Sequence, residues 1–233
     1  MTKLSNPIIR EIYDTGKVYD QNGNQIDVWA QVTEAHCTAL YQTVLKYRPQ
    51  SCVEIGMACG LSTLAILAAL RDIGEGGQLI SIDPYQSTER KGVGVANIER
   101  AGFADIHTLI EAFDYAALPR LLADGTRVDF GYIDGWHTFD YTLLDFFYLD
   151  KMTPVGGVVG FNDCGVRSVH RVLKFVKTHR RYKEIDVGLT SDYHARNFLY
   201  VAARKFLDFK WNDRYFEKSD DWEPDNTFFY SRF

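Results

Sequence analysis

The stretch VEIGMACGLST (residues 53–63) gathers residues that could bind a nucleotide-like ligand: an acid, two glycines and two hydroxyls. Gly56 and Gly60 favour a tight turn and a close approach of the ligand to the backbone. The helix expected after them would offer free N–H groups at its N-terminus. A dinucleotide site needs a further glycine in such a loop, where this chain has small or medium apolar residues. We therefore expect a ligand without a pyrophosphate.

Two carboxylates accompany this loop. Asp83 ends the second predicted strand, within the segment ISIDPYQ, where an acid can accept hydrogen bonds from both hydroxyls of a ribose. Glu54 lies in an apolar strand context, in which a carboxylate needs a cationic or N–H-bearing partner. A ribose, an amino-acid end and no pyrophosphate describe S-adenosylmethionine, which we predict as the cofactor. The alternative is a loop that only turns the chain, and it leaves Glu54 unexplained.

A second group of reactive residues follows the fourth and fifth predicted strands. Asp134 ends one strand in YIDGWH, and Asn162 and Asp163 end the next in FNDC. Two carboxylates and an amide oxygen on adjacent strand ends suit Mg²⁺, which takes few protein ligands and leaves room for substrate oxygens. In the alternative interpretation, Asp163 caps the helix that follows it.

His137 and Trp136 complete this group. A histidine titrates near neutral pH, so His137 suits a general base that takes the proton of a substrate hydroxyl. The alternative is a hydrogen-bonded histidine that caps the following helix. Trp136 offers a flat apolar wall for a purine, or it packs in the core.

Strand-like and helix-like segments alternate from about residue 31 onward, which indicates parallel strands with helices on both faces. We predict a Rossmann-like, doubly wound, mostly parallel seven-stranded α/β sheet with one antiparallel edge strand. The predicted strands are 51–56, 77–83, 106–112, 128–134, 156–161, 182–189 and 197–206. The predicted helices are 32–48, 61–77, 93–102, 115–125, 138–152 and 166–179.

Two segments lie outside this alternation. Residues 1–30 contain the turn signal DQNGNQ and are predicted to form a hairpin or an arm that acts as a lid. Residues 206–233 hold many aromatic side chains, which must pack on the chain's own domain, over the site or on a second subunit. We predict one domain, with its core at 31–205, and an aromatic tail that favours a homodimer.

Composition excludes several classes of protein. The net charge of −5 argues against a nucleic-acid partner, because phosphate binding needs a basic surface. The sequence has neither an apolar run that could span a bilayer nor the layout of a signal peptide, so we expect a cytoplasmic protein. The four cysteines form no C-x-x-C pair and are expected to be buried and reduced.

Residues 32–188 resemble the class I S-adenosylmethionine-dependent methyltransferases, and VEIGMACGLS is similar to the loop of the catechol O-methyltransferases. The segments IDPYQ and YIDGWHTFDYTLLD also resemble bacterial methyltransferases that include macrolide-sugar O-methyltransferases. The resemblance implies that Glu54 holds the methionine ammonium, Ser62 the carboxylate end and Asp83 the ribose. It also implies that Ala112, Phe113 and Trp136 contact the adenine. The predicted cofactor-binding residues are Glu54, Gly56, Met57, Ala58, Gly60, Ser62, Asp83, Ala112, Phe113, Asp134 and Trp136.

The same resemblance supports the predicted Mg²⁺ site and the role of His137 as general base. Catechol enzymes have an Asp–Asn pair after the fifth strand and the sugar enzymes Glu–Asp, whereas this chain has Asn162 followed by Asp163. The sugar enzymes have a histidine at the position of His137. The predicted function is transfer of a methyl group to a hydroxyl of a small molecule, assisted by Mg²⁺, with His137 and Asp134 catalytic. Alternatives are a metal-independent methyltransferase, a non-catalytic cofactor-binding protein and a nicotinamide oxidoreductase.

Overall fold

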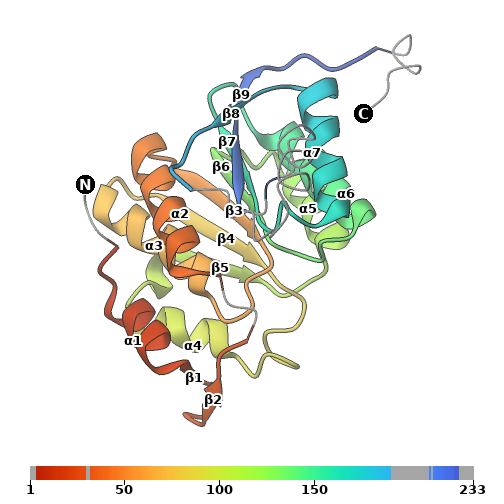
Figure 1. Ribbon diagram of the computed structural model, residues 1–233. Helices are drawn as coiled ribbons and strands as arrows, with labels where there is room; N and C mark the ends of the chain where they lie inside the picture. Colours follow the sequence, from red (N-terminus) through yellow and green to blue (C-terminus); the bar gives the residue numbers. More distant parts are fainter. Residues whose placement is uncertain (1–3, 30–31, 190–209, 211, 226–233) are drawn as a thin grey trace, which may run out of the picture.

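A seven-stranded sheet forms the centre of the protein in the computed structural model, which describes residues 4–29, 32–189, 210 and 212–225 (Figure 1). The strand order is β5-β4-β3-β6-β7-β9-β8. The strands are β3 (Ser51–Ile55), β4 (Gln78–Ile82), β5 (His107–Ile110), β6 (Phe130–Ile133), β7 (Val158–Phe161), β8 (Arg181–Ile185) and β9 (Arg214–Asp220). Adjacent strands from β5 to β7 pair in parallel, so their carboxyl ends meet at one edge of the sheet.

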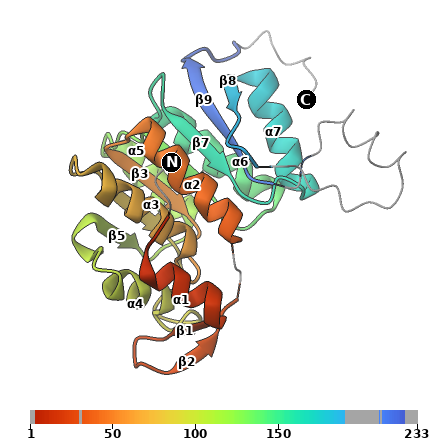
Figure 2. The ribbon, with the colours of Figure 1, turned by 60° about the vertical axis from the view of Figure 1, so that its left-hand side comes forward.

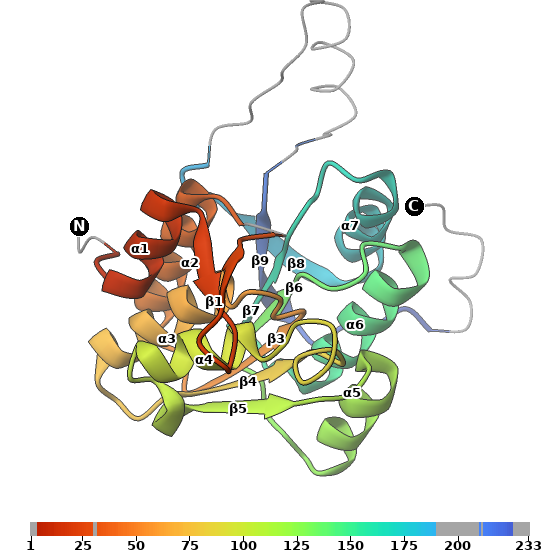
Figure 3. The same ribbon diagram turned by 90° about the horizontal axis from the view of Figure 1, so that it is seen from below.

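Helices cover both faces of this sheet, as predicted. Figures 1 and 3 show α1 to α4 on one side and α5 to α7 on the other. The helices are α1 (Pro7–Thr15), α2 (Glu34–Tyr47), α3 (Leu61–Ile73), α4 (Val93–Arg100), α5 (Asp114–Ala123), α6 (Phe139–Met152) and α7 (Arg167–His179). None of the helices in the described part of the chain is both long and apolar enough to cross a membrane.

The period of two along each strand divides the core into two clusters. Cys52 and Val158 pack in one cluster with α1 to α4, whereas their neighbours Val53 and Val159 pack in the other with α5 to α7. A strand that is apolar at consecutive positions can serve both faces, because successive side chains point to opposite sides. This pattern is why the short apolar runs of the sequence predicted the buried strands well.

The N-terminal segment forms a helix and a hairpin (Figure 2). Strands β1 (Lys17–Tyr19) and β2 (Gln25–Asp27) pair antiparallel, which confirms the hairpin predicted from DQNGNQ. The Asp20 carboxylate stabilises the turn, because it accepts hydrogen bonds from the backbone N–H groups of Asn22 and Asn24 at 2.9 and 2.8 Å. Helix α1 buries Ile12 in the same cluster as α3, so this segment is part of the folded core.

The antiparallel pairing lies at the β8 edge of the sheet, but the strand that runs against the others is β9, the penultimate one. The prediction at 197–206 lies outside the described residues. The observed strand comes instead from the aromatic tail, where Tyr215 and Phe216 are fully buried on opposite faces of the sheet. These two aromatics therefore pack on the chain's own domain. Helix α3 ends at Ile73, where Gly74 closes it with a left-handed backbone, φ 70°, which confirms the glycine-rich stop predicted at the end of 61–77.

Candidate functional site

The glycine loop between β3 and α3 is tightly folded against the rest of the chain. Gly56 has φ 87°, and a Cβ atom there would lie 2.1 Å from the carbonyl oxygen of Asp134. Gly60 has φ 82°, and a Cβ atom there would meet the backbone of Gly94 at 3.4 Å. Both positions need glycine, because L residues rarely adopt this backbone. The close approach at Gly56 is to the Asp134 loop, so the glycine couples the two loops of the site.

The Asp83 carboxylate accepts hydrogen bonds from the backbone N–H groups of this loop. Its Oδ2 accepts hydrogen bonds from the backbone N–H groups of Met57 and Ala58 at 3.2 and 2.9 Å, and from the Gln86 amide at 3.2 Å. Ala58 itself has a left-handed φ of 46°. Successive N–H groups in such a turn form an anion-binding concavity. Since a carboxylate of the chain already fills it, the loop leaves no place there for a ligand phosphate.

Glu54 and Ser62 bind one another. The Glu54 carboxylate is fully buried and accepts hydrogen bonds from the hydroxyls of Ser62 and Thr63 at 2.6 Å and of Ser81 at 2.7 Å. Burial raises the pKa of Glu54 to about 7, although these hydroxyls act to lower it. The ammonium and carboxylate roles implied for Glu54 and Ser62 stay predictions, and here the two side chains stabilise the start of α3.

A cavity of about 450 Å³ opens at the carboxyl ends of β3, β4 and β6. Its lining includes half of the predicted site residues: Gly56, Ala58, Asp83, Phe113, Asp134, Trp136 and His137. The remaining predicted residues are outside that lining: Glu54, Met57, Gly60, Ser62, Ala112, Asn162 and Asp163. The sequence thus located the cavity correctly, at the edge where ligands bind in open parallel sheets.

Aromatic side chains form one wall of this cavity. Tyr85 contacts Phe113 and Trp136 edge-to-face, with ring centroids 5.8 and 6.4 Å apart. Trp136 also contacts Tyr141, and Tyr115 stacks on Phe113. Trp136 is 52% exposed, which rules out the alternative of core packing. An exposed, rigid aromatic wall beside a cavity suits a flat ligand group such as a purine.

His137 lies between two carboxylates. Its Nε2 is 3.4 Å from Oδ1 of Asp134 and 3.9 Å from Oδ2 of Asp163. This nitrogen is buried, and its only close carboxylates among the described residues are these two. Burial lowers the pKa of His137, but the neighbouring carboxylates of Asp134 and Asp163 outweigh it, so the net effect is a raised pKa. His137 and Asp163 have left-handed φ angles of 35° and 49°, a strained backbone of the kind that clusters at functional sites.

A buried hydrogen-bonded group supports this centre, and it was missed at the sequence level. The Asp213 carboxylate, 3% exposed, accepts hydrogen bonds from the Tyr132 hydroxyl at 2.6 Å and the Asn162 amide at 3.1 Å. His36 Nδ1 lies 3.3 Å from the same carboxylate. Because the Asn162 nitrogen donates to Asp213, its amide oxygen is the atom left for other partners. Asp213 gave no signal in the sequence, because it precedes a strand in a segment predicted as a tail.

The predicted metal ligands fit Mg²⁺ in the type of their donor atoms. Asp134 and Asp163 flank one imidazole, and Asp163 is exposed enough to leave coordination positions for water or substrate. Asn162 can contribute its amide oxygen. Among the described residues, no three His, Cys, Asp or Glu side chains form a metal-binding group, so a site here would depend on the amide.

A pair of carboxyl groups lies behind the aromatic wall. Asp114 lines the cavity, and Asp145 of α6 is fully buried with no partner for its oxygens other than Asp114. Burial raises the pKa of Asp145 well above its ordinary value, and Asp114 adds to this effect. Burial thus favours the uncharged form of the Asp145 carboxyl, with the Asp114 carboxylate as its neighbour. Its spacing of four residues from the buried Leu149 could have placed it on the inner face of α6.

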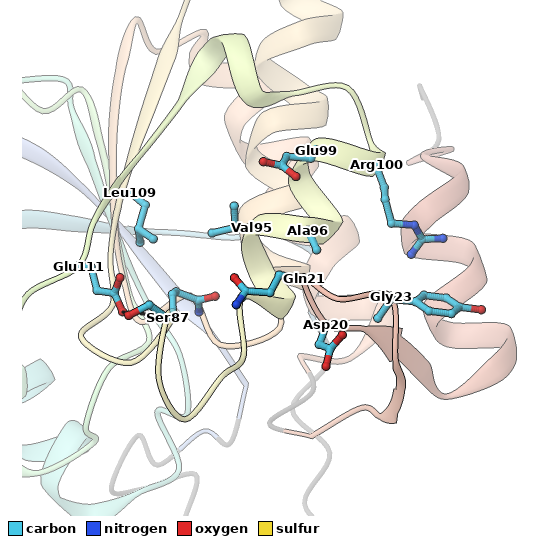
Figure 4. A pocket seen from close by; sticks show the side chains of 13 residues that line it. Asp20, Gln21, Gly23, Ser87, Val95, Ala96, Glu99, Arg100, Leu109 and Glu111 are labelled. Carbon is cyan, nitrogen blue, oxygen red and sulfur yellow. Dashed lines mark hydrogen bonds between the residues drawn. The ribbon is translucent and has the colours of Figure 1, made fainter.

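A second cavity, of about 530 Å³, lies between the β1–β2 hairpin, α4 and the end of β5 (Figure 4). Figure 4 shows Glu111 and Ser87 at one end and Arg100 at the other. Glu111 accepts hydrogen bonds from the Ser87 N–H and hydroxyl at 2.6 Å, and Arg100 pairs with Glu11 at 2.7 Å. These charged groups have partners within the chain, and they form no reactive pair.

Comparisons with known proteins agree with this geometry. The sequence model of a family described as a methyltransferase domain matches residues 53–164. The fold is similar to that of an O-methyltransferase from Bacillus cereus in complex with SAH, at 15% identity and a TM-score of 0.69 over 93% of this chain and 92% of that one. It is also similar to the O-methyltransferase TomG from Streptomyces achromogenes, involved in tomaymycin synthesis and solved with SAM, at 15% identity and a TM-score of 0.67 over 94% and 93%.

No curated protein matches the sequence. At these identities the solved structures establish the fold, and the family match covers the glycine loop, the Asp134 loop and the end of β7. Strands β3 to β7, with the cavity at their carboxyl ends, lie largely within the matched residues. Residues 53–164 thus match a methyltransferase domain, and they lie within a fold that the chain shares with O-methyltransferases solved with SAH or SAM.

Proposed function

We propose that the protein transfers the methyl group of S-adenosylmethionine to a hydroxyl oxygen of a small molecule, with His137 as general base. The observation that carries this proposal is the position of His137, which lines the cavity with its Nε2 3.4 Å from Oδ1 of Asp134. A nitrogen in this setting can accept the proton of a substrate hydroxyl. The involvement of TomG in tomaymycin synthesis supports a small-molecule acceptor by analogy.

The cofactor would follow the length of the cavity. Phe113 and Trp136 offer aromatic surface for the adenine. Oδ1 of Asp83 accepts only the Tyr85 N–H, at 2.9 Å, so it keeps a lone pair for a ribose hydroxyl. The amino-acid end would lie by Gly56 and Ala58. Because Asp83 already fills the anion-binding turn, the loop suits a cationic sulfonium better than the pyrophosphate of a nicotinamide cofactor.

The chemistry needs an oxygen nucleophile in line with the sulfonium methyl group. As the O–C bond forms and the C–S bond breaks, the sulfonium becomes a thioether and the hydroxyl proton passes to Nε2 of His137. Asp134 and Asp163 then stabilise the imidazolium that results, because both carboxylates face it. Asp213 holds Asn162 in a fixed orientation next to this centre.

We also propose that Mg²⁺ assists the reaction, held by Asp134, Asn162 and Asp163. When bound, the metal would lower the pKa of the acceptor hydroxyl and fix its position. Methyl transfer without a metal is the nearest alternative. The homodimer, the cytoplasmic location and the domain boundaries at residues 30 and 205 stay predictions.

The test measures methyl transfer from labelled S-adenosylmethionine to a panel of small aromatic alcohols and sugars. For His137→Asn we expect kcat to fall by about 10²- to 10⁴-fold while S-adenosylhomocysteine binds with nearly unchanged affinity. His179→Asn, a substitution at the last residue of α7, is the matched control. Unchanged kcat in His137→Asn would refute the base, and loss of activity with chelator that Mg²⁺ restores would separate the metal-dependent reaction from the alternative. Binding without any transfer would favour a non-catalytic protein.

A further inference from the structure

Among the described residues that line the cofactor cavity, Arg90 is the only lysine or arginine. The same lining contains four acidic side chains: Asp83, Glu89, Asp114 and Asp134. S-adenosylmethionine carries two cationic groups, the sulfonium and the ammonium, and one anionic group, the carboxylate. A cavity that binds it needs acids for the first two and one cation or N–H donor for the third.

The fold places Arg90 at the glycine-loop end of this cavity. The backbone of the 84–92 loop fixes it, since Arg90 N–H donates to the Tyr85 carbonyl at 2.9 Å and its own carbonyl accepts from Val93 at 3.1 Å. Its guanidinium lies 6.0 Å from the ring centroid of Trp29. It is also close enough to Cys59 for its charge to act against the burial that raises the pKa of that thiol. Ala58, beside Cys59, lines the cavity as well.

The Arg90 guanidinium has a hydrogen-bond donor that is not satisfied within the protein. Its Nε is buried and makes no hydrogen bond to any residue that the structure describes. A buried N–H without an acceptor costs stability, and an anionic ligand would remove that cost. An arginine presents several N–H donors in a planar fork that matches a carboxylate.

The other groups expected to bind the amino-acid carboxylate are occupied. The Ser62 hydroxyl donates to Glu54, and the N–H groups of Met57 and Ala58 donate to Asp83. We therefore infer that Arg90 binds the carboxylate of the amino-acid end of S-adenosylmethionine. This inference rests on the proposed function and adds a cofactor-binding residue to it. A carboxylate on the methyl acceptor offers the same chemistry, so the experiment must separate the two sources.

The experiment compares two ligands by calorimetry: S-adenosylhomocysteine and its decarboxylated analogue, which retains the adenosine, the thioether and the amine. For Arg90→Gln we expect roughly a tenfold to hundredfold loss of affinity for S-adenosylhomocysteine and little change for the analogue. Arg90→Lys keeps the charge but not the fork, and should lose less. Lys91→Gln removes the neighbouring exposed charge and is the matched control for long-range electrostatics.

Unchanged affinity for S-adenosylhomocysteine in Arg90→Gln would overturn the inference, and a raised KM for an acidic acceptor would then assign Arg90 to that substrate. Equal losses for both ligands would overturn it as well, because a structural role affects them alike. If the wild-type protein binds neither ligand, the proposed function itself fails. The inference is thus supported only if Arg90→Gln loses affinity for S-adenosylhomocysteine and keeps its affinity for the decarboxylated analogue.

Discussion

Glu54→Gln tests whether the carboxyl group beneath α3 is protonated in the folded protein. In wild type this group is fully buried and has three hydroxyl donors but no cation beside it. Burial raises its pKa from 4.5 to about 7. Between these two values the folded protein keeps a proton that the unfolded chain releases. Wild-type stability should therefore fall as the pH rises through this window.

The magnitude follows from the separation between the two pKa values. At about 1.4 kcal/mol per pKa unit, the contribution of Glu54 to the free energy of unfolding falls by about 3 kcal/mol from pH 4.5 to above pH 7. Glutamine is close in size and carries no charge at any pH. The stability of Glu54→Gln relative to wild type should therefore increase by about 3 kcal/mol over this range.

Urea denaturation of both proteins at pH 5, 6, 7 and 8, followed by circular dichroism, measures this difference. Glu99→Gln changes an exposed carboxylate and serves as the matched control. A difference between Glu54→Gln and wild type that stays flat, or that shrinks with rising pH, would refute the reasoning. It would mean that the three hydroxyls stabilise the charged form more than burial opposes it.

Two further substitutions test the packing that positions the site. Gly56→Ala places a methyl group where only 2.1 Å separates it from the Asp134 carbonyl, so we expect at least about 2 kcal/mol of destabilisation and a marked loss of cofactor binding, measured by urea denaturation and calorimetry. A stable variant with unchanged binding would contradict this contact. Asp150→Ala leaves the buried cations Arg180 and Lys218 without their shared carboxylate, 2.6 and 3.3 Å away, and should cost about 3–5 kcal/mol in the same denaturation assay. A loss below about 1 kcal/mol would show that the two cations find other partners.

Local patterns in the sequence predicted most of the fold. Apolar runs such as the one around Val53 have the length of a strand, and periodic segments such as the one around Leu149 have the spacing of a helix. These patterns depend on neighbours within a few residues, so they could be recognised without knowledge of the tertiary structure. Strand β9 was the exception. Its apolar core is only Tyr215 and Phe216, and it becomes a strand because β7 and β8 lie on either side of it.

For the site, the sequence by itself determined which loops meet, because parallel strands bring their carboxyl ends to one edge of the sheet. It therefore named Asp83, Asp134 and His137 correctly as neighbours of one cavity. Only the tertiary structure decided the partner of each side chain. Glu54 faces three hydroxyls, and Arg90 lines the cavity with an Nε that makes no hydrogen bond to the described residues. The physical reason is that side-chain direction and burial depend on contacts between segments far apart in the chain. The spacing of residues within a short segment does not predict such contacts.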